Sequence, residues 1–414
     1  MNHIRNIVFF IKKNGFFPTI KILYEKMCYR MTTAKKVARL EKNLPEIKKN
    51  RMLFHSHVEY GDNARYLSDY LVDKGYLDKY EIIWLVSNPE KYTAEARKGI
   101  RFIQELEGES GLRTFEAYEA VLSAGYVFFT SALRWVEDRV RRPEQRYIDL
   151  WHGCGYKGKK GGRISFDYVL VPGEMFVDVK KEFFGCDRAQ VLPLGYPRYD
   201  GLCAPVETDK VEKLLKKGNA KLVLWMPTFR NSVTADLNEK MDNGEFGLPI
   251  IRTEEQLREM NRFCRDNNII LALKRHPLQM QYHSLKPMSN IKMLDDNDFL
   301  QAQIRMYDFI GYSDALISDY SSISVDYLLL DKPIGFTLDD YEAYKEGRGF
   351  VFDNPLEFMP GAHLYDMEQM QDFLKQVAKG NDGWKQEREK VIHQMHNIPK
   401  NRQYCARIVD YFHL

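Results

Sequence analysis

The chain has 414 residues, and this length favours two domains because single hydrophobic cores rarely grow beyond roughly 250–300 residues. Its composition is typical of a soluble globular protein, with 44% hydrophobic, 13% aromatic and 29% charged residues. The six cysteines show no CxxC spacing, which argues for reduced thiols and against a disulfide framework or a zinc site. No run approaches the roughly 20 apolar residues that span a bilayer, and the run from Ile7 to Ile11 is too short for a signal-peptide core.

Positive charge is concentrated at the N-terminus, although the net charge is only +3. Residues 1–50 contain twelve Lys/Arg and three Glu, a local balance of +9 that leaves −6 for the remaining 364 residues. Apolar residues recur at helical spacing on both sides of Gly15, at Ile4, Ile7, Val8 and Ile11 and at Phe16, Phe17, Ile20, Leu23, Tyr24 and Met27. A basic amphipathic arm over residues 1–48 is typical of a peripheral anchor on anionic lipid. Packing against the body of the protein and a nucleic-acid arm are alternatives, and no recognised motif supports the second.

From Arg51 onward, short apolar runs alternate with longer, helix-like segments. The first series of predicted strands covers residues 52–54, 81–86, 102–103, 126–129, 147–150 and 168–171, with an amphipathic helix over 64–74. The second series covers residues 221–226, 269–274, 291–294, 315–318 and 333–336. Strands with little alternation, separated by helices, predict parallel sheets covered on both faces.

These two series predict an N-terminal Rossmann-like domain over 49–200 and a C-terminal Rossmann-like domain over 201–395. Residues 396–414 are expected to form a C-terminal helix that packs back on the N-terminal domain. Two doubly wound halves that face each other place a ligand cleft between them, at the carboxyl ends of their strands. We therefore expect residues with catalytic chemistry just after the predicted strands.

His152 follows the predicted strand 147–150 and precedes a loop rich in glycine and lysine. The glycines cannot continue a strand, so the imidazole is expected at the exposed end of that strand. An imidazole is well suited to moving a proton at neutral pH, while Lys157 and the amide of Gly153 suit a phosphate or pyrophosphate. A surface histidine in a basic loop is the simpler interpretation of this motif when it is taken alone.

Two further motifs follow strands of the second half. Arg230 comes just after the strand 221–226 and can hold a phosphate bidentately, with the hydroxyl of Thr228 beside it. A turn with a surface arginine also explains this pattern. The strand 269–274 leads into Arg275 and His276, and the two cations before His276 should make that histidine resist protonation. The neutral imidazole can still donate one N–H to a phosphoryl oxygen.

In the fourth motif, the strand 315–318 runs through Asp319 into a helix whose first turn carries the hydroxyls of Ser321 and Ser322. Helix amides, the helix dipole and the hydroxyls together make an anion site. Asp326 lies four residues beyond Ser322 on the same helical face, where it can accept hydrogen bonds from sugar or polyol hydroxyls. An ordinary Asp/Ser N-cap is the alternative.

As an ordered set, these motifs resemble the CDP-glycerol glycerophosphotransferase family, the teichoic acid primases and polymerases of Gram-positive bacteria. The resemblance is carried by Trp151-His152-Gly153, Pro227-Thr228-Phe229-Arg230, Arg275-His276-Pro277 and Ser318-Asp319-Tyr320-Ser321-Ser322. Supporting pieces are Gly61-Asp62-Asn63, Trp84-Leu85-Val86-Ser87-Asn88-Pro89, Gly195-Tyr196-Pro197-Arg198-Tyr199-Asp200 and Arg348-Gly349-Phe350-Val351-Phe352-Asp353. The resemblance covers roughly residues 50 to 410. The family commonly reads Trp-His-Gly-Thr-Pro-Leu-Lys, whereas this chain continues with Cys154-Gly155-Tyr156-Lys157, which leaves the acceptor and the exact donor open.

The resemblance implies an α/β, GT-B-like fold with two doubly wound parallel-sheet domains facing across a cleft. It implies an enzyme that transfers glycerol phosphate, or a related polyol phosphate, from a CDP-polyol to a lipid-linked saccharide or a growing polymer and releases CMP. It also implies that the N-terminal domain binds the acceptor, that the C-terminal domain binds the CDP donor, and that His152 and His276 are catalytic. Donor or phosphate binding is expected from Gly153, Lys157, Thr228, Arg230, Arg275, Asp319, Ser321, Ser322 and Asp326.

No cofactor is expected, because the CDP-polyol is a substrate and no spacing predicts a protein-bound metal. The expected location is peripheral, on the cytoplasmic face of the cell membrane, held by the N-terminal arm. The expected partners are the donor, the acceptor and anionic lipid, without nucleic acid, and a homo-oligomer is left open. The sequence also does not decide whether the donor polyol is glycerol or ribitol, or whether the protein acts as a primase or as a polymerase. Alternatives from other classes are a GT-B glycosyltransferase that uses a sugar nucleotide and a non-catalytic membrane-associated scaffold.

Overall fold

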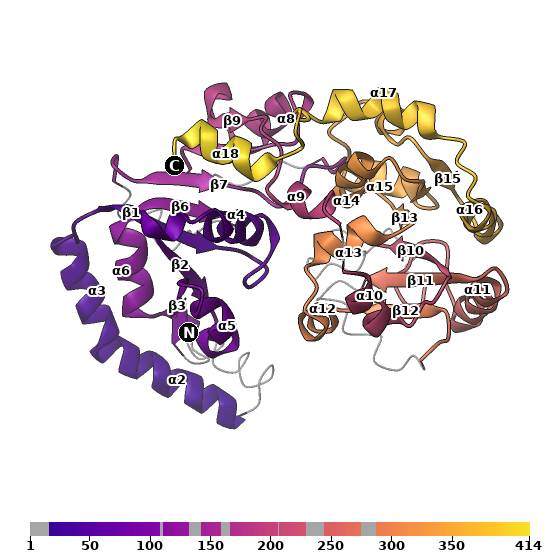
Figure 1. The fold of residues 1–414 in the computed structure, drawn as a ribbon. Helices are drawn as coiled ribbons and strands as arrows, with labels where there is room; N and C mark the ends of the chain where they lie inside the picture. Colours follow the sequence, from indigo (N-terminus) through magenta and orange to yellow (C-terminus); the bar gives the residue numbers. More distant parts are fainter. Residues whose placement is uncertain are drawn as a thin grey trace. The chain divides into compact units, whose positions relative to one another are not determined.

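The computed structural model describes residues 16–107, 111–131, 142–158, 166–205, 207–228, 244–274 and 287–414 (Figure 1). The chain divides into two compact units. The first comprises Met1–His152 and Ile164–Val169, and the second comprises Gly153–Arg163 and Leu170–Leu414. A predominantly parallel sheet forms the centre of each unit, as the apolar runs of the sequence predict.

The first sheet has the strand order β3-β2-β1-β6-β7-β8-β9 within the described residues. Its strands are β1 (Lys48–His55), β2 (Glu81–Val86), β3 (Arg101–Gln104), β6 (Ala124–Phe129), β7 (Arg146–Asp149), β8 (Tyr168–Leu170) and β9 (Val191–Leu192). Strand β1 pairs in parallel with both β2 and β6, and its residues Met52, Leu53 and Phe54 are fully buried. Burial on both faces explains why these three residues form an unbroken apolar run, whereas the exposed start of the strand is polar.

Helices and one small hairpin accompany this sheet. The helices are α2 (Phe16–Met31), α3 (Thr33–Lys42), α4 (Asp62–Asp73), η1 (Tyr76–Asp78), η2 (Pro89–Tyr92), α5 (Thr93–Ala96) and α6 (Phe115–Ser123), and the hairpin is β4 (Leu106–Glu107) with β5 (Leu112–Arg113). Helix α4 confirms the helix predicted over 64–74, with bounds one or two residues earlier. Helix α3 packs against α6 and buries Val37.

The second sheet has the order β12-β11-β10-β13-β14-β15. Its strands are β10 (Lys221–Trp225), β11 (Ile269–Lys274), β12 (Ile291–Leu294), β13 (Ala315–Ser318), β14 (Ile334–Thr337) and β15 (Ala362–Leu364). The helices of this unit are α8 (Met175–Phe184), η3 (Arg188–Gln190), α9 (Arg198–Leu202), α10 (Thr208–Leu215), α11 (Glu254–Asp266), α12 (Asp296–Ala302), α13 (Met306–Tyr312), α14 (Ser322–Tyr327), η6 (Leu328–Leu330), α15 (Tyr341–Gly347), η7 (Pro355–Phe358), α16 (Met367–Lys379), α17 (Lys385–Met395) and α18 (Tyr404–Phe412).

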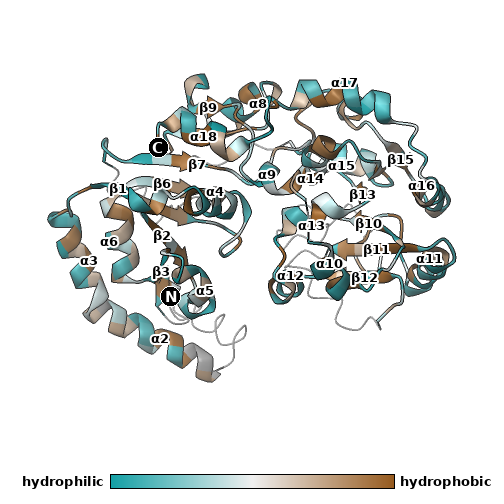
Figure 2. Cartoon of the chain, in the orientation of Figure 1, coloured by the Kyte–Doolittle hydropathy of each residue, from teal (hydrophilic) through white to brown (hydrophobic). Residues whose placement is uncertain are grey.

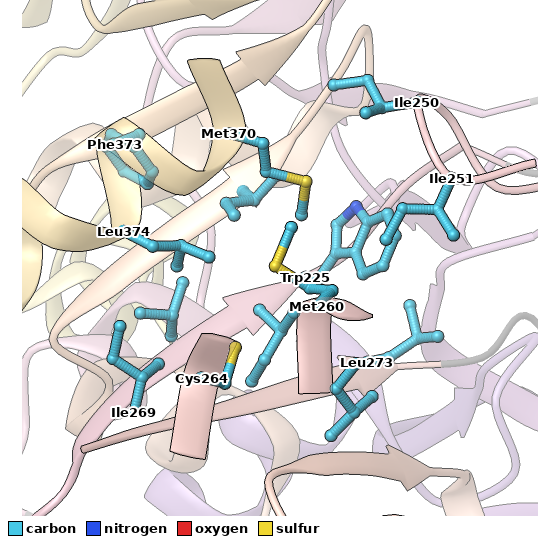
Figure 3. Packing of buried hydrophobic residues seen from close by; sticks show 14 of the residues in the cluster. Trp225, Ile250, Ile251, Met260, Cys264, Ile269, Leu273, Met370, Phe373 and Leu374 are labelled. Carbon is cyan, nitrogen blue, oxygen red and sulfur yellow. The ribbon is translucent and has the colours of Figure 1, made fainter. Parts of the chain in front are cut away.

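Trp225 at the end of β10 lies in the hydrophobic core of the second unit (Figure 3). It is fully buried, and Met260 from α11 and Met370 from α16 belong to the same cluster. Helix α11 begins with a capping box at Thr253 and then buries Leu257, Met260 and Cys264 at spacings of three and four residues. Helices α11 and α16 therefore cover one face of the sheet, and the strand ends carry the polar motifs.

The segment after β8 packs with the C-terminal helices. Helix α8 contacts α17, and a Cβ placed on Gly173 would lie 2.5 Å from the carbonyl oxygen of Met395. The carboxylate of Asp200, next to the predicted domain boundary, accepts hydrogen bonds from the backbone amides of Tyr404 (2.6 Å) and Cys405 (2.9 Å). These contacts explain why residues from 170 onward, assigned above to the N-terminal domain, group with the second unit. They also place the C-terminal helix α18 against α9.

Candidate active site

The turn that presents His152 is fixed by buried polar side chains. Strand β7 ends at Asp149, whose carboxylate accepts a hydrogen bond from the backbone amide of Trp151 (2.7 Å). The side-chain amide of Asn63 donates to the carbonyls of Leu150 (3.1 Å) and Trp151 (2.8 Å). Trp151 has a φ of +52°, a left-handed conformation that non-glycine residues seldom adopt. The sequence places His152 at an exposed strand end, and the structure confirms this placement.

A single carbonyl determines the tautomer of His152. Its Nδ1 lies 3.0 Å from the carbonyl oxygen of Thr130, the residue that follows β6. A carbonyl oxygen only accepts, so Nδ1 carries the proton and the basic lone pair of the neutral ring is on Nε2. This arrangement is the one that a general base needs, because the orienting hydrogen bond leaves the opposite nitrogen to accept a proton.

Gly153 and Gly155 let the loop after His152 lie directly against the start of helix α14. Gly153 has a φ of +133°, and a Cβ there would lie only 2.5 Å from Oγ of Ser322. A Cβ on Gly155 would lie 3.0 Å from the backbone nitrogen of Ser322. The glycines were predicted to make a sharp turn. In the structure they also permit a close approach that joins the first predicted motif to the fourth.

The loop continues as an extended segment. Lys157 forms an antiparallel bridge with Phe350, and the flanking bonds run from Gly158 N to the carbonyl of Gly349 (2.9 Å) and from Val351 N to that of Tyr156 (2.9 Å). The backbone of Lys157 is therefore tied to the segment Arg348–Asp353, which the resemblance had singled out. The side chain of Lys157 is half-buried.

Cys154, where the family commonly has threonine, is a buried residue of this loop. Its Sγ lies 3.2 Å from the hydroxyl of Tyr196, and burial raises the pKa of the Cys154 thiol above its ordinary value. A thiol with a raised pKa stays protonated at neutral pH, so Cys154 fills space and makes a weak hydrogen bond instead of acting as a nucleophile.

Asp319 joins the second predicted motif to the fourth. Its carboxylate accepts hydrogen bonds from the backbone amide and the hydroxyl of Thr228, and from the backbone amide of Ser321 (3.1 Å). Asp319 is fully buried, whereas Ser321 and Ser322 are half-buried. The carboxylate therefore holds the end of β10 beside the first turn of α14, and Thr228, Ser321 and Ser322 come together as the sequence indicated.

The side chains that bind Asp326 are not among the site residues predicted from the sequence. Its two carboxylate oxygens accept from Arg198 Nη2 (2.5 Å) and from the hydroxyls of Tyr199 and Tyr307 (both 2.6 Å). Both Arg198 and Asp326 are buried. A Cβ placed on Gly153 would lie 3.1 Å from Arg198 Nη2, so this guanidinium belongs to the surroundings of the loop after His152.

The sequence signal for Arg198 was the motif Gly195–Asp200, which had no assigned role. Its partner Asp326 is 128 residues away, so only the fold shows the pairing. Arg230, Arg275 and His276 lie outside the described residues. Lys274, just before Arg275, forms an ion pair with Asp296 at 2.9 Å.

Comparisons with known proteins identify the family of the chain and several of its relatives. The family model for CDP-glycerol:poly(glycerophosphate) glycerophosphotransferase matches residues 36–413. The chain is 27% identical over 273 residues to the teichoic acid glycerol-phosphate primase of Bacillus subtilis, covering 61% of this chain and 64% of the primase. The chain thus spans less than two thirds of that relative's length. It is 24% identical over 392 residues to the teichoic acid glycerol-phosphate transferase of Staphylococcus aureus, covering 87% of this chain and 90% of that one.

Among solved structures, a variant of the wall teichoic acid polymerase TagF soaked with CDPG superposes with a TM-score of 0.72. The alignment covers 95% of this chain and 97% of that chain at 21% identity, so the likeness shows the fold. The predicted GT-B-like α/β class is confirmed by this likeness and by the two parallel sheets. With the family model spanning nearly the whole chain, the protein belongs to the CDP-glycerol:poly(glycerophosphate) glycerophosphotransferase family.

Proposed function

We propose that the protein transfers glycerol phosphate, or a related polyol phosphate, from CDP-glycerol or a related CDP-polyol to a hydroxyl group and releases CMP. The acceptor is a lipid-linked saccharide or a growing poly(polyol phosphate) chain, in the synthesis of teichoic acid or a related cell-surface polymer. The observation that carries the proposal is the hydrogen bond between His152 Nδ1 and the Thr130 carbonyl, in a chain that belongs to this family. It gives the imidazole the tautomer required of a general base.

In the proposed reaction, Nε2 of His152 removes the proton from the acceptor hydroxyl. The acceptor oxygen attacks the phosphorus that bears the polyol, a new P–O bond forms, and the bond from that phosphorus to the bridging oxygen of the pyrophosphate breaks. CMP leaves with that oxygen, and a phosphodiester remains. Stabilising the charge on the transferred phosphoryl group is the role proposed for His276.

Donor binding is proposed for the elements around α14. Thr228, Ser321 and Ser322 contribute hydroxyls, and Arg230, Arg275 and Lys157 contribute cations to the pyrophosphate, with the backbone at Gly153 beside them. Asp319 supports this site by holding Thr228 and the amide of Ser321. Asp326 was expected to bind polyol hydroxyls. Its three bonds to Arg198, Tyr199 and Tyr307 favour a supporting role through Arg198.

Mass spectrometry of the products tests this function. The purified chain is incubated with a lipid-linked saccharide and, in separate reactions, with CDP-glycerol, CDP-ribitol and a UDP-sugar. Transfer from a CDP-polyol adds one polyol phosphate unit per event and releases CMP in equal amount. Transfer of a sugar from the UDP-sugar would instead make the protein a GT-B glycosyltransferase. Repeated addition on one acceptor separates a polymerase from a primase.

A peripheral location at the cytoplasmic face of the cell membrane is also part of the proposal. Helix α3 is anchored to the first unit, where Thr33 donates to Glu107 (2.7 Å), whereas α2 exposes apolar side chains. Hydrophobic and hydrophilic residues alternate along the ribbon of α2 (Figure 2). The exposed apolar residues of α2 are Phe17, Ile20, Leu23, Tyr24, Met27 and Met31. In the described part of the chain, every helix is too short or too polar to cross a bilayer. An interfacial helix needs only an apolar face and nearby basic residues.

A further inference from the structure

His57 lies beside the proposed general base at the carboxyl ends of neighbouring strands. Strands β1, β6 and β7 are adjacent and parallel, and they are followed by His57, Thr130 and His152 respectively. The carboxyl ends of parallel strands meet at one edge of a sheet, which is where α/β proteins bind their ligands. His57 is the last residue of His55-Ser56-His57, which directly follows the predicted strand 52–54, and it has no role in the proposed function.

Thr130 fixes the two imidazoles side by side. Its hydroxyl lies 3.1 Å from Nδ1 of His57 and 3.2 Å from the backbone nitrogen of His57, while its carbonyl holds Nδ1 of His152. Thr130 is fully buried, and its hydroxyl also contacts that of Ser56 at 3.0 Å. The two rings consequently lie with their centroids 5.1 Å apart and their planes inclined by 54°. Thr130 therefore contacts both imidazoles.

The backbone around this pair is strained. Tyr60, Asp62 and Trp151 have φ values of +44°, +53° and +52°, a conformation that costs L-residues energy. Two of them flank the turn after His57, and the third precedes His152. Strained residues persist only where the surrounding structure holds them, and they concentrate at functional sites. The strain therefore supports a function for both histidines.

The charge beside His57 limits what it can bind. Oδ2 of Asp62 lies 3.7 Å from Nδ1 of His57, and the His57 side chain is 42% exposed while that of Asp62 is 7% exposed. Asp62 and His152 are thus two titratable groups that lie beside this ring. A carboxylate repels a phosphate, whereas an imidazole can donate to or accept from a neutral hydroxyl. A hydroxyl ligand is therefore favoured over an anionic one.

We propose that His57 binds a second hydroxyl of the acceptor, on the carbon next to the hydroxyl that His152 deprotonates. The acceptor would then be a vicinal diol, a class that includes both saccharides and polyols. The inference rests on the proposed function, because it uses His152 as the base. Two imidazoles with centroids 5.1 Å apart can each reach one of two neighbouring hydroxyls through bonds of ordinary length. The second bond orients the attacking hydroxyl.

Soluble acceptor analogues test this proposal. The probes are a glycerol monoalkyl ether, which carries a vicinal diol, and its deoxy analogue that lacks only the neighbouring hydroxyl. We expect the unmodified protein to favour the diol about five- to tenfold in kcat/KM, the size of one hydrogen bond to a neutral group. His57→Phe should bring this ratio close to one, mainly by raising KM for the diol. His57→Gln, which keeps hydrogen-bonding groups, should restore part of the preference.

The matched control is His393→Phe, which changes an exposed histidine on α17. It should leave both the ratio and the KM for CDP-glycerol unchanged, and KM for CDP-glycerol should also stay unchanged in the His57 variants. An undiminished diol preference in His57→Phe would overturn the proposal. An equal loss on both analogues would also overturn it, because it would show that His57 acts only by supporting Thr130.

Direct binding separates this inference from the proposed function. Titration of the diol ether without donor, followed by the ring signals of the histidines in NMR spectra, needs no turnover. If the unmodified protein transfers nothing from any CDP-polyol, the proposed function fails, yet binding of the diol that depends on His57 still supports the second hydroxyl contact. Equal binding of the diol and its deoxy analogue contradicts the inference, whatever the assay shows.

Discussion

The carboxylate of Asp319 receives two hydrogen bonds from Thr228, one from the backbone amide at 2.7 Å and one from the hydroxyl at 2.6 Å. These bonds join the residue after β13 to the loop after β10, across 91 positions of sequence. Because the same carboxylate also accepts from the amide of Ser321, it determines how Thr228 and the first turn of α14 are presented to a ligand. The proposed donor site therefore depends on a residue that is itself fully buried.

Replacing Asp319 with alanine should weaken both the fold and the donor site. The change leaves the backbone amide and hydroxyl of Thr228 without their buried acceptor, which costs about 1–3 kcal/mol in the free energy of unfolding. The affinity for CDP-glycerol, measured by calorimetric titration, should decrease together with the stability. Asp366→Ala is the control, because it removes the carboxylate that caps α16 at the amide of Gln369 (2.8 Å) and should leave donor affinity unchanged. Donor affinity retained in Asp319→Ala would refute the supporting role.

The contact between Gly153 and Ser322 predicts a steric defect. In Gly153→Ala, the new Cβ meets Oγ of Ser322 at 2.5 Å on a backbone with a φ of +133°, so the loop after His152 must move. Overpacking of this kind costs about 1–3 kcal/mol in the free energy of unfolding. We expect the fractional loss of turnover to be larger than the fractional loss of stability. Gly185→Ala is matched for positive φ (+64°) but has no atom within 4 Å of the new Cβ. Partial recovery of turnover in the double variant Gly153→Ala/Ser322→Gly would identify the clash as the cause. If Gly153→Ala lost no more turnover than Gly185→Ala, the result would contradict the importance of the contact.

His152→Ala should abolish transfer while leaving the fold intact. The side chain is exposed, and a general base contributes on the order of 10²–10⁴ in rate, so kcat should fall by that factor while CDP-glycerol affinity stays near its original value. Steady-state kinetics and donor titration measure the two effects. His393→Ala controls for the loss of an exposed imidazole. Near-normal turnover by a well-folded His152→Ala protein would rule out His152 as the base.

The sequence predicts those features of the fold and the site that depend only on residues close together in the chain. Strand β11 matches its predicted bounds, because a strand buried on both faces reads as an apolar run. The placement of His152 was also predictable, since it needs only a strand end followed by glycine. Strand β15 was missed, because three residues with a central His363 carry no such signal.

Long-range pairings were not predictable. In sequence, an aspartate that holds a loop looks the same as one that binds a ligand. Both Asp319 and Asp326 are predicted to bind the donor, yet their carboxylates bind protein groups in the structure. The carbonyl of Thr130, which determines the tautomer of His152, is a backbone group 22 residues away and has no signature at all. Chemistry can therefore be assigned to residue types from sequence, whereas the groups that orient those residues require the fold.

His396 predicts a pH dependence of stability. This fully buried histidine lies between α17 and α18, and its Nε2 donates to the carbonyl of Val325 (2.8 Å). Burial lowers the pKa of His396 below its ordinary value of 6.5. Between the folded pKa and 6.5, the unfolded chain binds a proton that the folded protein does not. The free energy of unfolding is therefore highest above about pH 6.5, and it decreases as the pH falls from 6.5 to the folded pKa of His396.

Denaturant unfolding at pH 7.5, 6.5 and 5.5 measures this effect. The free energy of unfolding should decrease toward pH 5.5 in the unmodified protein. The decrease should be smaller in His396→Gln, which keeps a donor for the carbonyl of Val325 but does not titrate. The same decrease in both proteins would show that other groups govern the acid dependence.

The exposed face of α2 predicts binding to anionic lipid. Phe17 is 81% exposed, Tyr24 is 62% exposed and Met31 is 63% exposed, and these residues follow one another at seven-residue spacing along the helix. Basic residues nearby add attraction worth roughly 1 kcal/mol each near an anionic surface, and this part weakens with salt. Sedimentation with anionic vesicles should therefore fall with rising salt and be lost on deleting about the first 30 residues. Replacing Phe17, Tyr24 and Met31 with serine should weaken binding even at low salt, because it removes the apolar contribution.

Exposed apolar residues elsewhere on the chain provide the control for this lipid binding. A variant with serine at Leu300, Tyr365 and Tyr411 should sediment like the unmodified protein. Activity on a short, water-soluble acceptor should survive the N-terminal deletion, since α3 is anchored separately by Thr33 and Val37. Full sedimentation of the truncated protein would instead show that α2 packs against protein and that another surface binds the membrane.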